Sequence, residues 1–153
     1  MTGGMMVDRR FSLLFTGALC GCLAAVLTAG CGYSPDLPPV AGVSGTVTLD
    51  GNPLPRGTVQ FVPDASQGTT GAPGVGYIDE NGRYEVSTAG VKGAIVGKHK
   101  VAVVALEEFD PMTTSYAPSL IPERYNDADS SGLAFEVKAG ENNVIDLKLT
   151  SGP

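Results

Sequence analysis

From residue 43 to the end of the chain, apolar and polar residues alternate in short runs that are separated by turn residues. In the run 43–49, VSGTVTL, an apolar residue or glycine fills every second position, and in 83–88, RYEVST, Tyr84 and Val86 alternate with charged residues. A period of two places every second side chain on one face, which is typical of a strand with one buried face. The chain after residue 42 therefore predicts strands rather than helices.

About seven such runs are joined by turn signals, of which the Asp50-Gly51 pair is one. Short strands in this number and spacing are typical of a β-sandwich, so we expect an all-β, seven-stranded Greek-key sandwich. The run 98–106 is apolar on both faces after Lys100, which predicts a central strand that is covered on both sides. The strands are expected at residues 43–49, 58–62, 74–78, 83–88, 98–106, 133–137 and 142–150.

The beginning of the chain has a different character. Arg9 and Arg10 precede an uncharged, largely apolar run over residues 11–30 that ends in small residues. A basic start, an apolar stretch and small residues before a break are typical of an export signal, here expected as a signal helix. The run also has about the length that spans a bilayer, so a retained transmembrane helix is the alternative. We interpret residues 1–30 as a lipoprotein signal peptide for the following reason.

This leader ends in LTAGC, residues 27–31, which resembles the lipobox of bacterial lipoproteins. The resemblance implies that Cys31 receives a diacylglyceryl group on its sulfur, that cleavage occurs just before it, and that its new amine is usually acylated. Several acyl chains together make a stable membrane anchor. The lipobox favours Leu where this chain has Thr28. LCGC at residues 19–22 has Leu in that place, which makes Cys22 the alternative, although its apolar stretch is short.

Residues 31–42 are then predicted to be the lipidated cysteine and a tether, in which three prolines favour an extended backbone. The folded domain is expected over residues 43–150. Gly32, rather than Asp, follows Cys31. By resemblance to other lipoproteins this implies the outer membrane rather than the inner one.

Composition narrows the classes of function. The chain has 16 Asp and Glu against 10 Lys and Arg, without a basic cluster, so nucleic acid is not an expected partner, because phosphates require a Lys/Arg footprint. All three cysteines, Cys20, Cys22 and Cys31, lie in the first 31 residues. The body therefore has no disulfide and must rest on its apolar core.

Three stretches of the body are similar to the carboxypeptidase regulatory-like domains: VSGTVTLDGNPLPRGTVQFVP from residue 43, GYIDENGRYEVS from residue 76 and GKHKVAVV from residue 97. Gly51 and Gly82 suit the positive φ of tight turns, and Asp79 can bond its own turn backbone. The resemblance covers roughly residues 43–150. It implies a transthyretin-like sandwich that is accessory or structural, without catalysis of its own.

The stretch NDADSSGL contains a candidate metal site. Asp127, Asp129 and Ser131, followed by a glycine, match the start of a calcium-binding loop. The match ends there, because Lys138 occupies the twelfth position, where such loops have a bidentate Glu. We therefore expect an acidic turn that leads into a strand, with calcium binding as the alternative, and no cofactor.

His99 is the only histidine, which excludes zinc sites built on histidine pairs. It lies between Lys98 and Lys100 on an expected strand, where the neighbouring charges disfavour the imidazolium form. No nucleophile motif accompanies it, so no catalytic residue is assigned and the chain is not expected to be an enzyme.

The segment 107–131 exceeds normal loop lengths, and such loops are usually functional or disordered. Its stretch YAPSLIPERY mixes aromatic, aliphatic and charged residues. One interpretation is that they close an open end of the sandwich, since scattered apolar loop residues usually serve packing. The other is a partner-docking surface, because aromatic residues and Arg concentrate binding energy. The interaction candidates are Tyr116, Leu120, Ile121, Arg124 and Tyr125.

Together these features predict a non-catalytic envelope lipoprotein that is tethered to a membrane and whose sandwich is a structural or protein-interaction module. The alternative is a domain that binds carbohydrate or another ligand. Sugar sites on sandwiches generally use exposed aromatic residues, and the chain has no Trp and five Tyr. The expected partners are the membrane, through the lipid anchor, and an unknown envelope protein or glycan.

Overall fold

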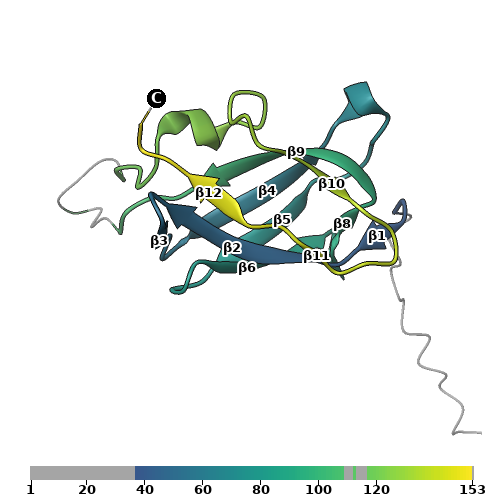
Figure 1. Ribbon diagram of the computed structural model, residues 1–153, viewed down its shortest axis with the longest axis horizontal. Helices are drawn as coiled ribbons and strands as arrows, with labels where there is room; N and C mark the ends of the chain where they lie inside the picture. The colour runs from purple at the N-terminus through teal and green to yellow at the C-terminus, as the bar shows by residue number, and fades with distance from the viewer. Residues whose placement is uncertain (1–36, 109–111, 113–116, 153) are drawn as a thin grey trace, which may run out of the picture. The chain divides into compact units, whose positions relative to one another are not determined.

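The structure is a computed structural model (Figure 1), and it describes residues 37–108, 112 and 117–152, which belong to the compact unit Pro35–Pro153. The expected signal peptide, the candidate lipidation sites Cys22 and Cys31, and the interaction candidate Tyr116 lie outside the described residues. Within the described ranges, no helix is long and apolar enough to cross a membrane.

The described residues form strands, turns and two short 3-10 helices, without an α-helix, so the predicted all-β class is confirmed. The 3-10 helices are η1 (Ala65–Gln67) and η2 (Glu123–Asn126). The strands are β1 (Val40–Ala41), β2 (Val43–Leu49), β3 (Asn52–Pro53), β4 (Gly57–Pro63), β5 (Gly74–Ile78), β6 (Arg83–Thr88), β7 (Val91–Lys92), β8 (Ala94–Ile95), β9 (Gly97–Val104), β10 (Ala134–Val137), β11 (Asn143–Val144) and β12 (Leu147–Leu149).

Most of these strands form one curled sheet in the order β10-β9-β4-β5-β6-β2-β11. β12 and β3 also pair with β2, and β7 pairs with β6, whereas β1 and β8 form a separate pair. Neighbouring strands are antiparallel except for β11 and β12, which run parallel to β2. The first long strand of the domain is thus the partner of the last two, as Figure 1 shows.

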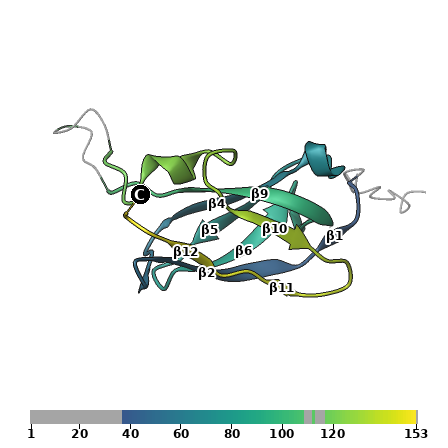
Figure 2. The same ribbon diagram turned by 45° about the horizontal axis from the view of Figure 1, so that its top comes forward.

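Strand β6 is where the sheet turns over onto itself. Its residues Val86 and Ser87 pair with β5, and residues 83–85 pair with β2. The layer of β4, β5 and β9 consequently lies over the layer of β2 and β12, as seen in Figure 2. The alternation predicted for this strand is confirmed, since Tyr84 and Val86 are buried and the charged residues beside them are exposed.

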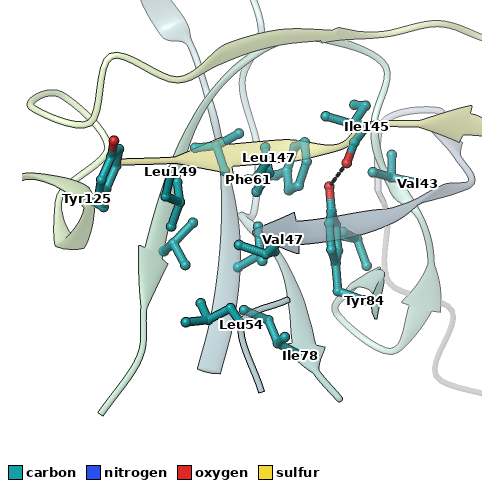
Figure 3. Packing of buried hydrophobic residues seen from close by; sticks show 14 of the residues in the cluster. Val43, Val47, Leu54, Phe61, Ile78, Tyr84, Tyr125, Ile145, Leu147 and Leu149 are labelled. Carbon is teal, nitrogen blue, oxygen red and sulfur yellow. Dashed lines mark hydrogen bonds between the residues drawn. The ribbon is translucent and has the colours of Figure 1, made fainter. Parts of the chain in front are cut away.

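The core lies between the two layers and is largely aliphatic, with Phe61 as its largest fully buried side chain. Ile121 and Tyr125, from the segment after β9, join this core, and Figure 3 shows Tyr125 at the end of it beside Leu149. Burying each large apolar side chain contributes roughly 1.5–3 kcal/mol. The core residues labelled in Figure 3 are Val43, Val47, Leu54, Phe61, Ile78, Tyr84, Tyr125, Ile145, Leu147 and Leu149.

The run 142–150, predicted as one strand, forms the two strands β11 and β12, because Ile145 and Asp146 interrupt the pairing. The Tyr84 hydroxyl donates a hydrogen bond of 2.6 Å to the Ile145 carbonyl oxygen, drawn as a dashed line in Figure 3. Burial raises the pKa of Tyr84, so this hydroxyl keeps its proton. The Asp146 carboxylate accepts hydrogen bonds of 2.9 and 2.7 Å from the N–H and hydroxyl of Thr46.

Gly45 of β2 makes this close approach possible. A Cβ at Gly45 would overlap the carbonyl group of Ile145. Because glycine has no side chain, the segment between β11 and β12 can lie directly against β2. Tyr84, the partner of Gly45 in the β2–β6 register, then reaches the same carbonyl.

Strand β9 differs in part from the expectation of a strand that is covered on both sides. Val101, Ala102 and Val103 are buried, but Val104 and Leu106 are 40% and 44% exposed. Only the middle of the strand is therefore buried on both faces. The two-residue strands β1, β3, β7 and β8 were not predicted, because two residues carry no readable period.

Replacing Gly45 with Ala should lower the free energy of unfolding by about 3 kcal/mol, because the new methyl group would push against a backbone carbonyl that cannot move without breaking the Tyr84 hydrogen bond. Urea denaturation measures this change. Gly152→Ala is the matched control, since nothing lies within 4 Å of a Cβ added there. Equal midpoints for the two variants would contradict the importance of this close approach.

Candidate functional site

The segment proposed for partner docking packs into the domain. Ile121 and Tyr125 are 4% and 6% exposed, and Leu120 is partly buried against the core. The Arg124 guanidinium lies 4.6 Å from the centre of the Tyr125 ring and donates hydrogen bonds to Thr150. The packing interpretation accounts for Ile121 and Tyr125, because their side chains are buried and that of Tyr125 is bonded to Thr150.

The side chains of the acidic turn at 127–131 are engaged in hydrogen bonds to other groups of the protein. Asp127 accepts hydrogen bonds from the N–H groups of Asp129 and Ser130 at 2.9 and 3.1 Å. Asp129 accepts one of 2.6 Å from Lys100, and the buried hydroxyl of Ser131 donates to the Val101 carbonyl at 2.6 Å. This geometry favours the turn over the calcium site, and among the described residues no three His, Cys, Asp or Glu side chains gather in a way that could hold a metal.

His99 on β9 points into the core, where its ring lies 6.0 Å from that of Phe61 in an edge-on arrangement. Nδ1 lies 3.1 Å from the Gly97 carbonyl oxygen, and Nε2 is buried without a hydrogen-bond partner among the described residues. Burial lowers the pKa of His99. The flanking lysines are not the cause, because alternate residues of a strand point to opposite faces.

A more exposed feature is the outer face of β5, β4 and β9 near the ends of these strands. Tyr77, Thr58 and Val104 stand in one row across the three strands by register. Tyr77 is 79% exposed, the highest value for any described aromatic residue, and Val104 and Leu106 are also exposed. We call these four residues the Tyr77 face.

Sequence reasoning missed this face because a large apolar residue in a strand is usually assigned to the core. In β5, GVGYI, the buried positions are Gly74, Gly76 and Ile78, while Val75 and Tyr77 point outward. A Cβ on Gly74 would press on Val86, and one on Gly76 would press on the Tyr84 ring. The pattern of alternating glycines was the available signal, since inward glycines force the large residues between them to the surface.

A second surface feature is an open groove of about 480 Å³ between η1 and β10, at the other end of the same outer layer. Lys98 of β9 and Glu136 of β10 are partners in the strand register, and both line the groove. His99 contributes to its floor. The remaining lining residues are Asp64, Gln67, Ala134 and Phe135.

Comparison with known proteins adds little to this geometry. No protein-family model matches the chain, and a search of curated proteins finds no match. A crystal structure of a 9R-lipoxygenase from Cyanothece PCC8801 is similar at 20% identity and a TM-score of 0.36. The matched region covers 72% of this chain but only 16% of the lipoxygenase chain. At this TM-score the similarity carries no argument about fold or activity.

The expectation that the chain is not an enzyme is withdrawn. It rested only on the lack of a catalytic motif, and the solved structure named above is that of an enzyme. The match is too weak to assign an activity to this chain.

Replacing His99 with Leu should reduce the loss of stability in acid. Burial sets the pKa of the folded protein below the unfolded value of about 6.5, so between these values the unfolded chain binds more protons. The contribution of His99 to stability is therefore complete above about pH 6.5 and falls as the pH drops below it, by at most about 1.4 kcal/mol per pH unit.

Urea denaturation of both proteins at about pH 7.5 and 5.5 measures this difference. All other ionisable groups are the same in the two proteins. If His99→Leu loses as much stability between these pH values as the unsubstituted protein, His99 is not a cause of the loss in acid.

Proposed function

We propose that the chain is a bacterial envelope lipoprotein, held to a membrane by acyl chains on Cys31, with Cys22 as the alternative site. Its β-domain would serve as a structural or protein-interaction module, and the outer membrane is the favoured location. The leader supports this proposal through its two arginines, its apolar run and the LTAGC sequence at residues 27–31. Leu37 to Pro39, the first described residues, continue the proline-rich tether into β1.

We further propose that the domain is a carboxypeptidase regulatory-like sandwich of the transthyretin type, with Greek-key connections. The two facing layers are compatible with this assignment. The turn chemistry also supports it, because Gly51 and Gly82 have φ values of 85° and 78°. Asp79 accepts hydrogen bonds from the N–H groups of Asn81 and Arg83 at 2.9 and 2.8 Å, as the motif leads one to expect.

The observation that carries the interaction role is the position of the Tyr77 face. Its exposed apolar residues lie at the ends of β4 and β9 near β3, whereas β1, where the tether leads in, lies at the opposite end of the domain (Figure 1). An ion pair of 2.7 Å between Arg56 and Glu108 lies beside the face and gives it a polar border. Exposed apolar residues with a polar rim are typical of protein contact surfaces.

Replacing Cys31 with Ser should abolish labelling of the protein by a fatty-acid probe in the native cells, because the serine oxygen does not replace the thiolate in the transfer of the lipid. Cys20→Ser is the matched control and should be labelled normally. Labelling that persists in Cys31→Ser and disappears in Cys22→Ser would move the anchor to Cys22. Labelling that survives all three substitutions would contradict the lipoprotein assignment.

A second candidate function, glycan binding, is favoured by the exposure of Tyr77, because an accessible aromatic ring on the outer face of a sheet can stack on the apolar face of a sugar. The exposed Gln60, on the same strand as Thr58, would supply a hydrogen-bonding group nearby.

The two candidates predict different adducts at the Tyr77 face. A photo-reactive amino acid placed at Leu106 in intact cells should yield a protein adduct if the partner is a protein, while the same group at the exposed Glu141, near β11, should not. A glycan partner should instead give a signal on a glycan array that Tyr77→Ala reduces about fivefold, since stacking on an aromatic ring is worth about 1 kcal/mol. Absence of both signals would rule out the interaction role.

A further inference from the structure

The groove between η1 and β10 has the dimensions and the charges of a small-ligand site. Its volume of about 480 Å³ lies within the range of sites for small molecules. The floor is formed by β9 and β10, and Asp64 and Gln67 contribute the wall on the η1 side. The charged residues of this lining indicate the chemistry of the ligand.

The oppositely charged side chains of Lys98 and Glu136 both line the groove but do not form an ion pair with each other. Lys98 and Glu136 are direct partners on antiparallel strands, and such residues have Cβ atoms about 4.5–5.5 Å apart, close enough to form an ion pair. Among the residues the structure describes, neither takes part in an ion pair. The reason is visible at Lys98, whose Nζ donates a hydrogen bond of 3.2 Å to Gln67 Oε1. Gln67 thus draws the ammonium group toward η1 and away from Glu136.

The neighbouring charges are already engaged. Lys100, two residue pairs along the strands, is bound to Asp129 at 2.6 Å. The Asp64 carboxylate accepts hydrogen bonds from the N–H and hydroxyl of Ser66 at 3.0 and 2.6 Å, which stabilise the start of η1. The groove therefore carries one cation, Lys98, and two carboxylates, Glu136 on the β10 side and Asp64, which is held in place by Ser66.

We propose that this groove binds a short zwitterionic peptide of about dipeptide size. The peptide carboxylate would contact Lys98 and the Gln67 amide, and its ammonium group would contact Glu136. Two extended residues span about 7 Å, which suits charges displaced to opposite walls of a groove. A simple anion would meet the carboxylates of Asp64 and Glu136 as well as Lys98, so a ligand that carries both charges fits the lining better.

This site goes beyond the proposed function and does not depend on it, because neither lipid attachment nor the Tyr77 face contributes to the groove. Solvent screens the two charges, so we expect a dissociation constant of about 1 mM.

The test is a titration of the full chain in detergent with the dipeptide Ala-Ala, followed by NMR at the ring of His99. This is the only histidine in the chain, so its signal needs no assignment among others, and its buried ring lies next to the groove. The expected result is a saturable shift with Ala-Ala and at least about tenfold weaker binding of N-acetyl-Ala-Ala-amide, which has the same backbone without the charges. No saturable shift at about 10 mM Ala-Ala, or equal binding of the blocked peptide, would overturn the proposal.

Variants locate the two contacts. Lys98→Gln and Glu136→Gln should each weaken binding of Ala-Ala at least about fivefold, because each removes one charge that meets an opposite charge of the ligand. Lys92→Gln and Glu141→Gln remove the same charges at exposed positions outside the groove and should leave binding unchanged. If all four variants bind equally, Ala-Ala is bound elsewhere and the assignment of this groove is wrong.

Discussion

The hydrogen bond from the Tyr84 hydroxyl to the Ile145 carbonyl oxygen is the interaction on which the arrangement of this domain depends. It joins β6 to the segment between β11 and β12, and it crosses over β2, the strand that pairs with both. A buried carbonyl without a hydrogen-bond partner costs roughly 1–3 kcal/mol. The break between β11 and β12 avoids this cost because Tyr84 donates a hydrogen bond to the Ile145 carbonyl. Gly45 supplies the space in which the contact forms.

The same tyrosine explains the exposed face on the other layer. Its ring lies 3.2 Å from where a Cβ at Gly76 would be, beside the Glu85 carbonyl oxygen at 2.9 Å, and Val86 lies 2.7 Å from a Cβ at Gly74. Because β5 has glycines at these inward positions, its large residues Val75 and Tyr77 fall on the outside. The surface aromatic residue is therefore a consequence of how the interior is filled, since a large ring in the core requires a small partner in the facing strand.

The alternation of apolar and polar residues predicts the strands that have a clear period. It does not predict features of the fold that depend on tertiary contacts. The boundaries of β2, β5 and β6 agree with the predicted runs, because each run alternates and is bounded by turn residues. The division of the run 142–150 could not be predicted, since it depends on the space that Gly45 leaves in another strand, whereas the outward position of Tyr77 follows from the glycines of its own strand. The charges of the groove were equally hidden, because only the β9–β10 register brings Lys98 opposite Glu136.

The pairing of β2 with β11 and β12 also sets the order of events in folding. Thr46 and Asp146, which touch across this pairing, are 100 residues apart in the chain. Contacts between such distant residues must overcome the entropy of closing a long loop, and domains that depend on them fold slowly. Val47 lies beside Leu147 in the register and remains uncovered by β12 until Leu147 has been made. A chain that emerges from its N-terminus therefore cannot complete this layer before β12 has been made, and until then it remains in a condition in which a polypeptide can still be threaded through a narrow channel.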